Sequence, residues 1–307
     1  MKIDLIVVLG PTASGKTGFA AHLAYEIDGE IISADSRQVY KKMDLGTGKD
    51  YEDYIVEGKK IENHLVDIHE PGYKYNVYEF QKDFLNVYYD IHQRNKIPVL
   101  CGGTGMYIEA VLKGYKLLPV PPDNDLREEL NKHSHERLKE MLYSYNPKLH
   151  NTTDLNSKKR ILRAIEIAKY YSENSKLDTN YPEIKPVVFG IGFDRLTQRE
   201  RITDRLKQRL NAGMVEEVEI LMSEGVKKDD LLYYGLEYKY IALYVTGELT
   251  YYEMFEKLNT AIHQFAKRQM TWFRRMERNG TKINWIDANF TMEEKIEIAR
   301  KVLDNVN

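Results

Sequence analysis

The residues best suited to chemistry lie in a glycine-rich segment near the N-terminus. Gly10-Pro-Thr-Ala-Ser-Gly-Lys-Thr17 matches the pattern Gly-x4-Gly-Lys-Ser/Thr without a gap. Glycines at both ends let backbone N–H groups turn toward an anion, and a following helix adds the partial positive charge of its N-terminus. Lys16 supplies a full charge to phosphate oxygens, and the Thr17 hydroxyl can hold Mg²⁺. The pattern predicts a di- or triphosphate site made by Gly10, Pro11, Thr12, Ala13, Ser14, Gly15, Lys16 and Thr17. A kinase, an ATPase and a diphosphate-using transferase all need such a site.

Polar residues also follow two apolar runs further along the chain. Asp35 comes after the run at residues 30–33, and Thr104 follows the run at residues 97–101. The carboxyl ends of parallel strands meet at one edge of a sheet, so we expect both side chains beside the glycine loop. Asp35 is suited to bind Mg²⁺, to accept a proton from a nucleophile, or to cap the next helix. Thr104 is suited to a ligand contact, although its glycine-rich surroundings also fit an ordinary turn.

The segments that would position these residues alternate between strand and helix patterns. Helical spacing at residues 16–27 and 77–94 places helices between short apolar runs. The runs predicted to be buried parallel strands are residues 5–9, 30–33, 97–101 and 187–193. This alternation predicts an α/β fold, a P-loop NTPase-like parallel sheet flanked by helices. The remaining C-terminal elements are predicted as helices at 197–222, 238–244 and 250–276, a strand at 283–286 and a last helix.

The middle of the chain differs from the rest in composition and hydrophobic pattern. Pro119, Pro121 and Pro122 interrupt the pattern, and a charged, helix-favouring stretch then covers residues 125–171. A polar loop at residues 174–186 leads back to the apolar runs. We therefore predict a helical insertion at residues 118–182, hung on an α/β core made by residues 1–117 and 183–307.

Composition limits the class of protein. The chain has 307 residues, 42% of them hydrophobic and 30% charged, with a net charge of −2. Cys101 is the single cysteine, which excludes an intramolecular disulfide and a Cys-based zinc site. No apolar run approaches the ~20 residues of a membrane span, so we expect no membrane partner. We also expect the protein to be cytoplasmic and to act as a monomer. Basic residues gather at residues 195–209 and 267–278, where solvated helix faces are the simplest interpretation.

Several segments together resemble one family, the tRNA dimethylallyltransferases, also called tRNA isopentenyltransferases. The similarity extends over nearly the whole chain, and the segments occur in the family's order. They are residues 10–17, Ser33-Ala-Asp-Ser36, Lys42-Met-Asp-Leu-Gly-Thr47, His64-Leu-Val-Asp67, Gly102-Gly-Thr104 and Ala266-Lys-Arg-Gln-Met-Thr-Trp272.

The resemblance implies a transfer reaction in which the glycine loop holds the diphosphate of dimethylallyl diphosphate. The N6 amine of the adenosine next to the 3′ side of the anticodon would attack C1 and expel diphosphate. Asp35 matches the family's general base, and Thr104 looks like the hydroxyl that touches the phosphates or the reacting centre. Lys16, Mg²⁺ and an arginine would stabilise the leaving group. Arg201 and Arg205 share a helix face, and one of them would reach the diphosphate.

The resemblance also implies contacts with the tRNA anticodon arm. The implied tRNA-binding residues are Asp35, Ser36, Arg37, Gln38, Thr104, Arg127, Lys159, Arg160, Arg163, Lys267 and Arg268. Basic residues of the insertion would contact phosphates, which positions RNA without reading its sequence. Trp272 fits either a stacking role on a base or a place in the core.

One segment departs from the family pattern. Gly235 is followed by Leu236 and Glu237, where family members usually have tyrosine and then a basic residue. This places an acid where a tRNA contact is expected.

Three other functions use parts of the same pattern. A prenyltransferase acting on free adenine nucleotides needs no basic helical insertion, and a small-molecule kinase needs the phosphate loop alone. A nucleotide-gated RNA-binding module would need no chemistry from Asp35.

Overall fold

The computed structural model describes residues 3–145, 155, 157–174 and 181–306. The chain divides into two compact units, one made by Met1–Gly114 with Glu183–Asn307 and the other by Tyr115–Pro182. The second unit thus begins at Tyr115, near the boundary expected at residue 118.

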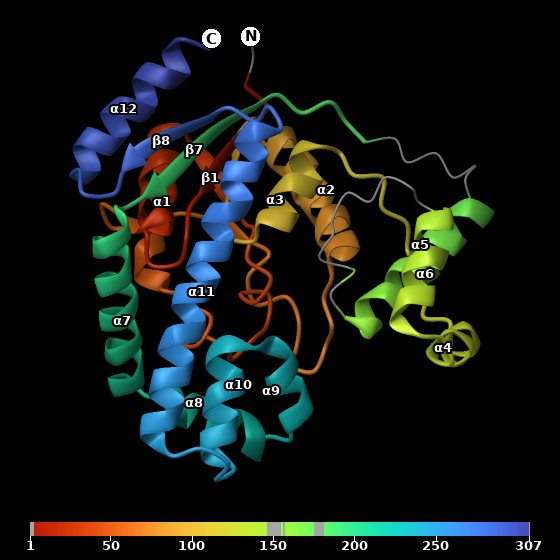
Figure 1. Cartoon of the computed structure of the whole chain (residues 1–307). Helices are drawn as coiled ribbons and strands as arrows, with labels where there is room; N and C mark the ends of the chain where they lie inside the picture. The colour runs from red at the N-terminus through yellow and green to blue at the C-terminus, as the bar shows by residue number, and fades with distance from the viewer. Residues whose placement is uncertain (1–2, 146–154, 156, 175–180, 307) are drawn as a thin grey trace. The chain divides into compact units, whose positions relative to one another are not determined.

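The first unit is built on a six-stranded sheet in which every neighbouring pair is parallel (Figure 1). Its order is β5 (Asn63–His64), β2 (Gly29–Ser33), β6 (Ile97–Gly102), β1 (Leu5–Leu9), β7 (Pro186–Gly192) and β8 (Ile283–Asp287). All residues of β1 and β2 are buried. Burial explains the continuous apolar run of β1, whereas β2 also buries the polar side chains of Glu30 and Ser33. The predicted parallel sheet and its strands are confirmed, and the short edge strand β5 was not predicted.

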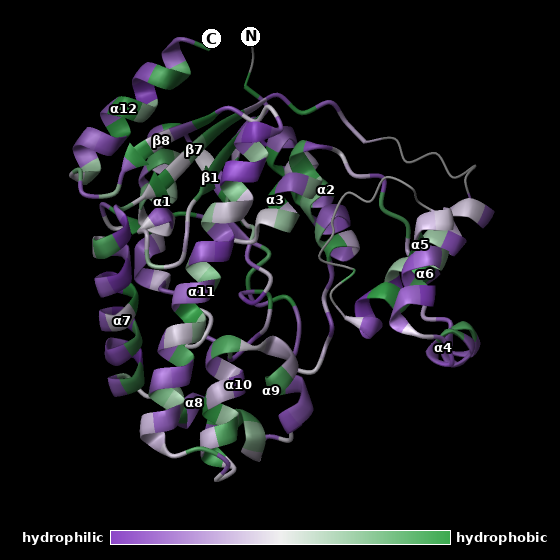
Figure 2. Ribbon diagram, in the orientation of Figure 1, coloured by the Kyte–Doolittle hydropathy of each residue, from purple (hydrophilic) through white to green (hydrophobic). Residues whose placement is uncertain are grey.

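Helices cover both faces of the sheet, and the sheet separates the hydrophobic core into two clusters. Ile6 and Val8 of β1 face α1 (Lys16–Glu26) and α12 (Met292–Asp304), while Val7 and Leu9 face the opposite core. That second core includes α2 (Val77–Gln93), α3 (Gly105–Leu112) and α11 (Tyr251–Arg278). The alternation along one strand follows from the strand period of two. In Figure 2, α2 and α11 show both hydrophobic and hydrophilic residues, as expected of helices with one buried face.

The predicted helix at residues 197–222 is wrong as a single element. The chain forms α7 (Arg195–Asn211) and α8 (Met214–Ser223), separated at Gly213, whose φ of 101° is left-handed and unsuited to a continuing helix. The following helices are α9 (Lys228–Tyr234) and α10 (Leu236–Val245), which meet at Gly235. Helical periodicity alone did not reveal the break at Gly213, and α9 was not predicted.

A short 3₁₀ helix, η1 (Tyr51–Tyr54), leads into a small hairpin of β3 (Ile55–Val56) and β4 (Lys59–Lys60).

The second unit contains α4 (Asn124–Asn131), α5 (His135–Tyr145) and α6 (Lys158–Glu173). Its own small core is made by Leu130, Leu138, Leu142, Ile161, Leu162 and Ile165. The helical character predicted for this segment is therefore seen in its described residues. Among the helices of the described ranges, none has the length and apolarity to cross a membrane.

Candidate active site

The glycine loop lies between the end of β1 and the start of α1, as its pattern predicts. Ala13 and Gly15 have left-handed φ values of 60° and 77°, and Gly15 is the N-cap of α1. Gly10 allows close packing, because a Cβ there would lie 2.4 Å from the carbonyl oxygen of Ile191. The loop can therefore direct backbone N–H groups and the helix N-terminus to one anion.

Lys16 is the loop's full positive charge. Its Nζ lies 3.4 Å from the carbonyl oxygen of Pro11. Burial lowers the pKa of Lys16, an effect that Cys101 and Asp35 oppose and that Arg205 strengthens. An anionic ligand in this position would stabilise the charged form of the ammonium group.

A cavity of about 840 Å³ opens at this edge of the sheet. It is large enough for a prenyl diphosphate together with a nucleobase. The predicted site residues that line it are Thr12, Ala13, Ser14, Gly15, Lys16, Thr17, Asp35, Ser36, Arg37, Gln38, Thr104, Arg201 and Arg205. Gly10 and Pro11 are not among the lining residues.

Asp35 and Thr104 meet through the loops that follow β2 and β6. Asp35 Oδ1 accepts a 2.8 Å hydrogen bond from the backbone N–H of Arg37 within a turn. No helix starts at this point of the chain, so the helix-capping alternative is wrong. Thr104 Oγ1 accepts from the backbone N–H of Ser36 at 3.1 Å, which ties the two loops together. No described residue hydrogen-bonds Asp35 Oδ2, and this oxygen is open to a ligand in the cavity.

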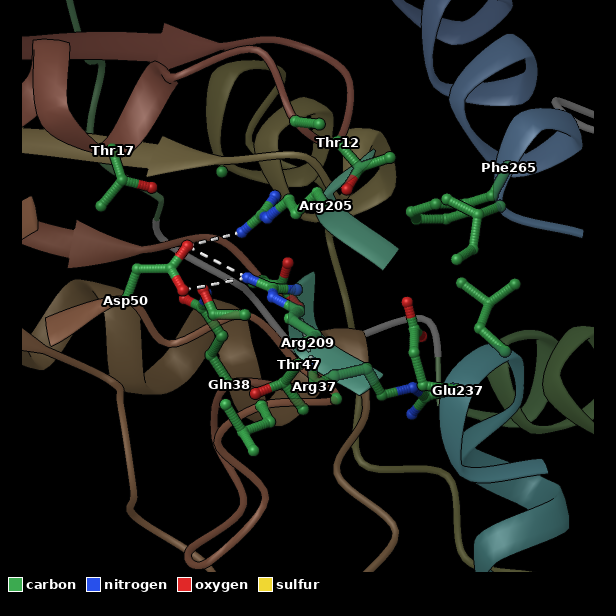
Figure 3. Close-up of a pocket in the computed structure, with 18 of the residues that line it drawn as sticks. Thr12, Thr17, Arg37, Gln38, Thr47, Asp50, Arg205, Arg209, Glu237 and Phe265 are labelled. Atoms are coloured by element: carbon green, nitrogen blue, oxygen red, sulfur yellow. Dashed lines mark hydrogen bonds and ion pairs between the residues drawn. The ribbon is translucent and has the colours of Figure 1, made fainter. Parts of the chain in front are cut away.

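Three arginines at intervals of four line the cavity from α7. Arg201 Nε lies 3.4 Å from the carbonyl oxygen of Ala13 in the glycine loop, and its guanidinium group lies 4.6 Å from the ring centroid of Phe193. Arg205 and Arg209 both bind Asp50, at 2.7 and 3.0 Å (Figure 3). Burial and the nearby Arg205 lower the pKa of Arg209. Sequence reasoning gave no role to Arg209 or Asp50, although the spacing of four from Arg205 would have found Arg209.

A buried glutamine that the sequence did not single out fixes the loop. Gln269 of α11 accepts from the backbone N–H of Thr12 at 2.9 Å and donates to the carbonyl oxygen of Gly103 at 3.0 Å. It thereby joins the ends of β1 and β6 through one side chain. Gln269 lies within the segment Ala266–Trp272 that carried the family resemblance, so that segment contained the signal.

The loop at residues 42–50 is held by charged side chains that were not predicted. Glu217 accepts backbone hydrogen bonds from Asp44, Leu45 and Gly46. Lys49 is buried and binds the carboxylates of Asp44 and Asp67. These ties involve the segments at residues 42–47 and 64–67, and they position the cavity wall that carries Asp50.

The predicted RNA contacts in the first unit differ in accessibility. Gln38 is used internally, since it donates to the carbonyl oxygen of Gly48 at 3.1 Å and accepts from Ser33 at 3.0 Å. Lys267 and Arg268 are exposed on α11. Trp272 packs against the core, and the guanidinium group of Arg275 lies 4.0 Å from its ring centroid. These contacts match the core interpretation of Trp272.

The predicted contacts in the second unit also separate into two kinds. Arg127 binds the carboxylate of Glu166 at 2.8 Å, and Arg163 binds the same carboxylate and the carbonyl oxygen of Val120. Glu166 is buried, so both arginines neutralise an internal charge. Lys159 and Arg160 are exposed on α6.

Comparison with known proteins identifies the family of the chain. Residues 38–276 match the family model described as IPP transferase. The chain belongs to the IPP transferase family. Residues 1–62 also match a model described as isopentenyl transferase.

Relatives in the IPP transferase family cover nearly the full chain. It is similar to tRNA dimethylallyltransferase 2 of Bacteroides fragilis, with 58% identity over 98% of each chain. The protein of the same name from Phocaeicola vulgatus is 56% identical over 100% of this chain and 99% of its own. A solved tRNA isopentenylpyrophosphate transferase from Bacillus halodurans shares 31% identity and a TM-score of 0.72, covering 99% of this chain and 96% of that one. A eukaryotic dimethylallyltransferase acting on tRNA shares the fold, with a TM-score of 0.78 and 22% identity over 98% of this chain and 79% of its own.

The atypical segment of this IPP transferase faces the cavity. Leu236 has a left-handed φ of 41°, which is uncommon for a bulky residue and marks local strain. Glu237 lies at the start of α10 and lines the cavity beside Arg209 (Figure 3). Burial raises the pKa of Glu237 to about 7, although its own backbone N–H and the two arginines Arg209 and Arg205 act in the opposite direction.

We expect Gln269→Ala to weaken both the fold and the phosphate site. The change leaves the Thr12 N–H and the Gly103 carbonyl without their partner, which should lower the free energy of unfolding by about 1–3 kcal/mol. Urea unfolding and calorimetric titration with inorganic diphosphate measure the two effects. Gln264→Ala, at an exposed position of the same helix, is the control. Unchanged stability and diphosphate affinity in Gln269→Ala would contradict the assigned bridge.

Glu237 should make stability depend on pH. Between its ordinary value of 4.5 and about 7, the unfolded carboxyl loses its proton while the folded one keeps it. The unfolded state then binds fewer protons, so the free energy of unfolding falls as pH rises through this window. We expect Glu237→Gln to be more stable than the wild type by about 1–3 kcal/mol at pH ~8 and by little at pH ~4.5. Thermal unfolding at both pH values tests this, with exposed Glu256→Gln as control; equal differences at both would refute it.

Proposed function

We propose that this protein transfers the dimethylallyl group of dimethylallyl diphosphate to N6 of the adenosine 3′-adjacent to the anticodon in tRNA, acting in the cytoplasm as a monomer. The observation that carries the proposal is the cavity in which the phosphate loop, three arginines and Asp35 converge. The tRNA dimethylallyltransferases that share more than half of its residues support this function over transfer to free nucleotides or kinase activity.

The glycine loop and Lys16 would bind the diphosphate. As the N6 lone pair attacks C1 of the prenyl group, the bond between C1 and the bridging oxygen breaks and negative charge collects on diphosphate. Lys16, the loop N–H groups and Arg201 are placed to stabilise that charge. Arg205 can exchange Asp50 for a phosphate oxygen, because both are anionic acceptors.

Asp35 would take the proton that N6 releases. Its Oδ1 is occupied by the Arg37 N–H, which fixes the carboxylate and leaves Oδ2 for the amine. An aromatic amine is a poor nucleophile, and removing its proton as the bond forms contributes about 10²–10⁴-fold. The Thr104 hydroxyl, held by the Ser36 N–H, would orient the reacting centre from the opposite loop.

Mg²⁺ is part of the proposal. In the described residues no group of three or more His, Cys, Asp or Glu side chains could hold a metal ion. The Thr17 hydroxyl lines the cavity, and Mg²⁺ commonly binds one or two protein oxygens together with phosphate oxygens and water. The donor set therefore fits Mg²⁺ that arrives with the diphosphate and neutralises its charge.

The tRNA would contact exposed cations on both units. Lys267 and Arg268 of the first unit, and Lys159 and Arg160 of the second, are suited to phosphate groups. Arg127 and Arg163 would act indirectly, by holding α6 through Glu166.

Mass spectrometry of tRNA incubated with the protein, Mg²⁺ and dimethylallyl diphosphate tests the function. We expect one dimethylallyl group on adenosine, none on AMP, and no phosphate transfer from ATP. Asp35→Asn keeps the oxygen that accepts from Arg37 but cannot take a proton, so turnover should fall about 10²–10⁴-fold with diphosphate binding retained. Lys16→Met should instead lose diphosphate affinity. Unmodified tRNA with the wild type, or wild-type turnover in Asp35→Asn, would overturn the assignment.

A further inference from the structure

Aromatic rings and cations gather at the border of the cavity, outside the groups that serve the reaction. They come from the loop before α2, the end of α9 and the loop after β2. We call this group the rim cluster; its members are Arg37, His69, Tyr73, Lys74 and Tyr233.

Tyr73 presents a fixed and accessible ring. It stacks on His69, with 4.2 Å between ring centroids and 12° between planes. Its hydroxyl donates to the carboxylate of Glu79, so both ends of the side chain are held. Tyr73 nevertheless remains 44% exposed. A large ring that is held in place yet open to solvent is well prepared for stacking, because little side-chain entropy remains to be lost.

Tyr233 presents a second ring, flanked by cations. It is also 44% exposed. Arg37 and Lys74 lie 5.5 and 5.7 Å from its ring centroid. Neither cation forms an ion pair with a carboxylate of the described residues. The Arg37 guanidinium group makes a 3.5 Å hydrogen bond to the Tyr233 carbonyl oxygen and also lies 5.7 Å from the ring centroid of Tyr234. Exposed cation–π contacts of this kind are weak and exchange readily for a stronger partner.

The rim cluster is continuous with the cavity. Arg37 and Tyr234 line the cavity itself. The Tyr234 hydroxyl accepts from the backbone N–H of Gly72, and its ring lies 5.8 Å from that of Tyr233. Tyr234 thus joins the loop that carries Tyr73 to the helix that carries Tyr233. Asp230 is the acidic side chain that faces Tyr234 and Gly72.

We propose that the rim cluster stacks the unpaired nucleotides that neighbour the target adenosine in the substrate RNA. The inference rests on the proposed function and adds a contact surface to it. Single-stranded RNA offers a binding partner to both kinds of side chain in the rim cluster. Its flat bases can stack on the exposed tyrosines, and its phosphates can pair with Arg37 and Lys74, which have no carboxylate partner in the described residues. Stacking tolerates any base, so the rim cluster would hold the loop while the target adenosine enters the cavity.

Binding of an anticodon stem-loop RNA, followed by fluorescence anisotropy, tests the proposal. We expect Tyr73→Ala and Tyr233→Ala each to weaken binding about tenfold, and Tyr73→Phe and Tyr233→Phe to bind almost as the wild type, since the stacking ring is kept. Tyr252→Ala is the matched control, because Tyr252 is 73% exposed on α11 and contacts no member of the rim cluster. Titration with inorganic diphosphate shows whether each variant keeps an intact phosphate site.

Abasic substitutions in the RNA locate the stacked nucleotides. If Tyr233 stacks on a given base, removing that base should weaken wild-type binding about tenfold and leave the affinity of Tyr233→Ala almost unchanged. Losses of RNA affinity that are additive at every position, or alanine variants that bind the RNA as the wild type does, would contradict stacking by the rim cluster. A wild type that binds RNA but never prenylates it would instead overturn the proposed function.

Discussion

The rest of the molecule depends on one constraint: the backbone N–H groups of the glycine loop and its lysine converge and need an anion as their partner. Where β1 ends, the chain passes through left-handed Ala13 and Gly15 and starts α1 at Lys16, so backbone donors and an ammonium group converge. Like charges and unpaired donors in a cavity are costly, and the surrounding residues offset that cost. Gln269 takes up the Thr12 N–H, and Asp50 pairs with two of the cavity's arginines, Arg205 and Arg209.

The order of strands converts this local site into a reaction centre. β2 and β6 lie on the same side of β1, and their parallel direction brings the residues that follow them to the loop's edge of the sheet. Asp35 and Thr104 are thereby placed opposite each other, and the hydrogen bond from the Ser36 N–H to Thr104 holds the two loops in register. The carboxylate and the phosphate site then face the same cavity.

Local patterns predicted β1, β6 and β7 well because each is an apolar run, whereas the two-residue strand β5 contains none and was missed. They failed at Gly213, where a left-handed backbone divides α7 from α8, and they did not reveal the helix α9. Among the candidate site residues, those next to strand ends were found from the sequence. Gln269 was missed because an amide on a long amphipathic helix has no local mark of its partners, which lie far away in the sequence.

The sequence by itself determined the phosphate loop, the parallel sheet and the family, because these depend on residues close together in the chain or on their order. Only the tertiary structure decided which charged side chains have an ion-pair partner within the protein. Arg163 lies in a basic run and Arg127 matches a family position, so both look like RNA contacts, but both bind buried Glu166. Arg37 instead lies over the ring of Tyr233 without a carboxylate partner in the described residues. The physical reason is that the partners of a charged side chain are set by long-range packing and burial, which no spacing along the chain records.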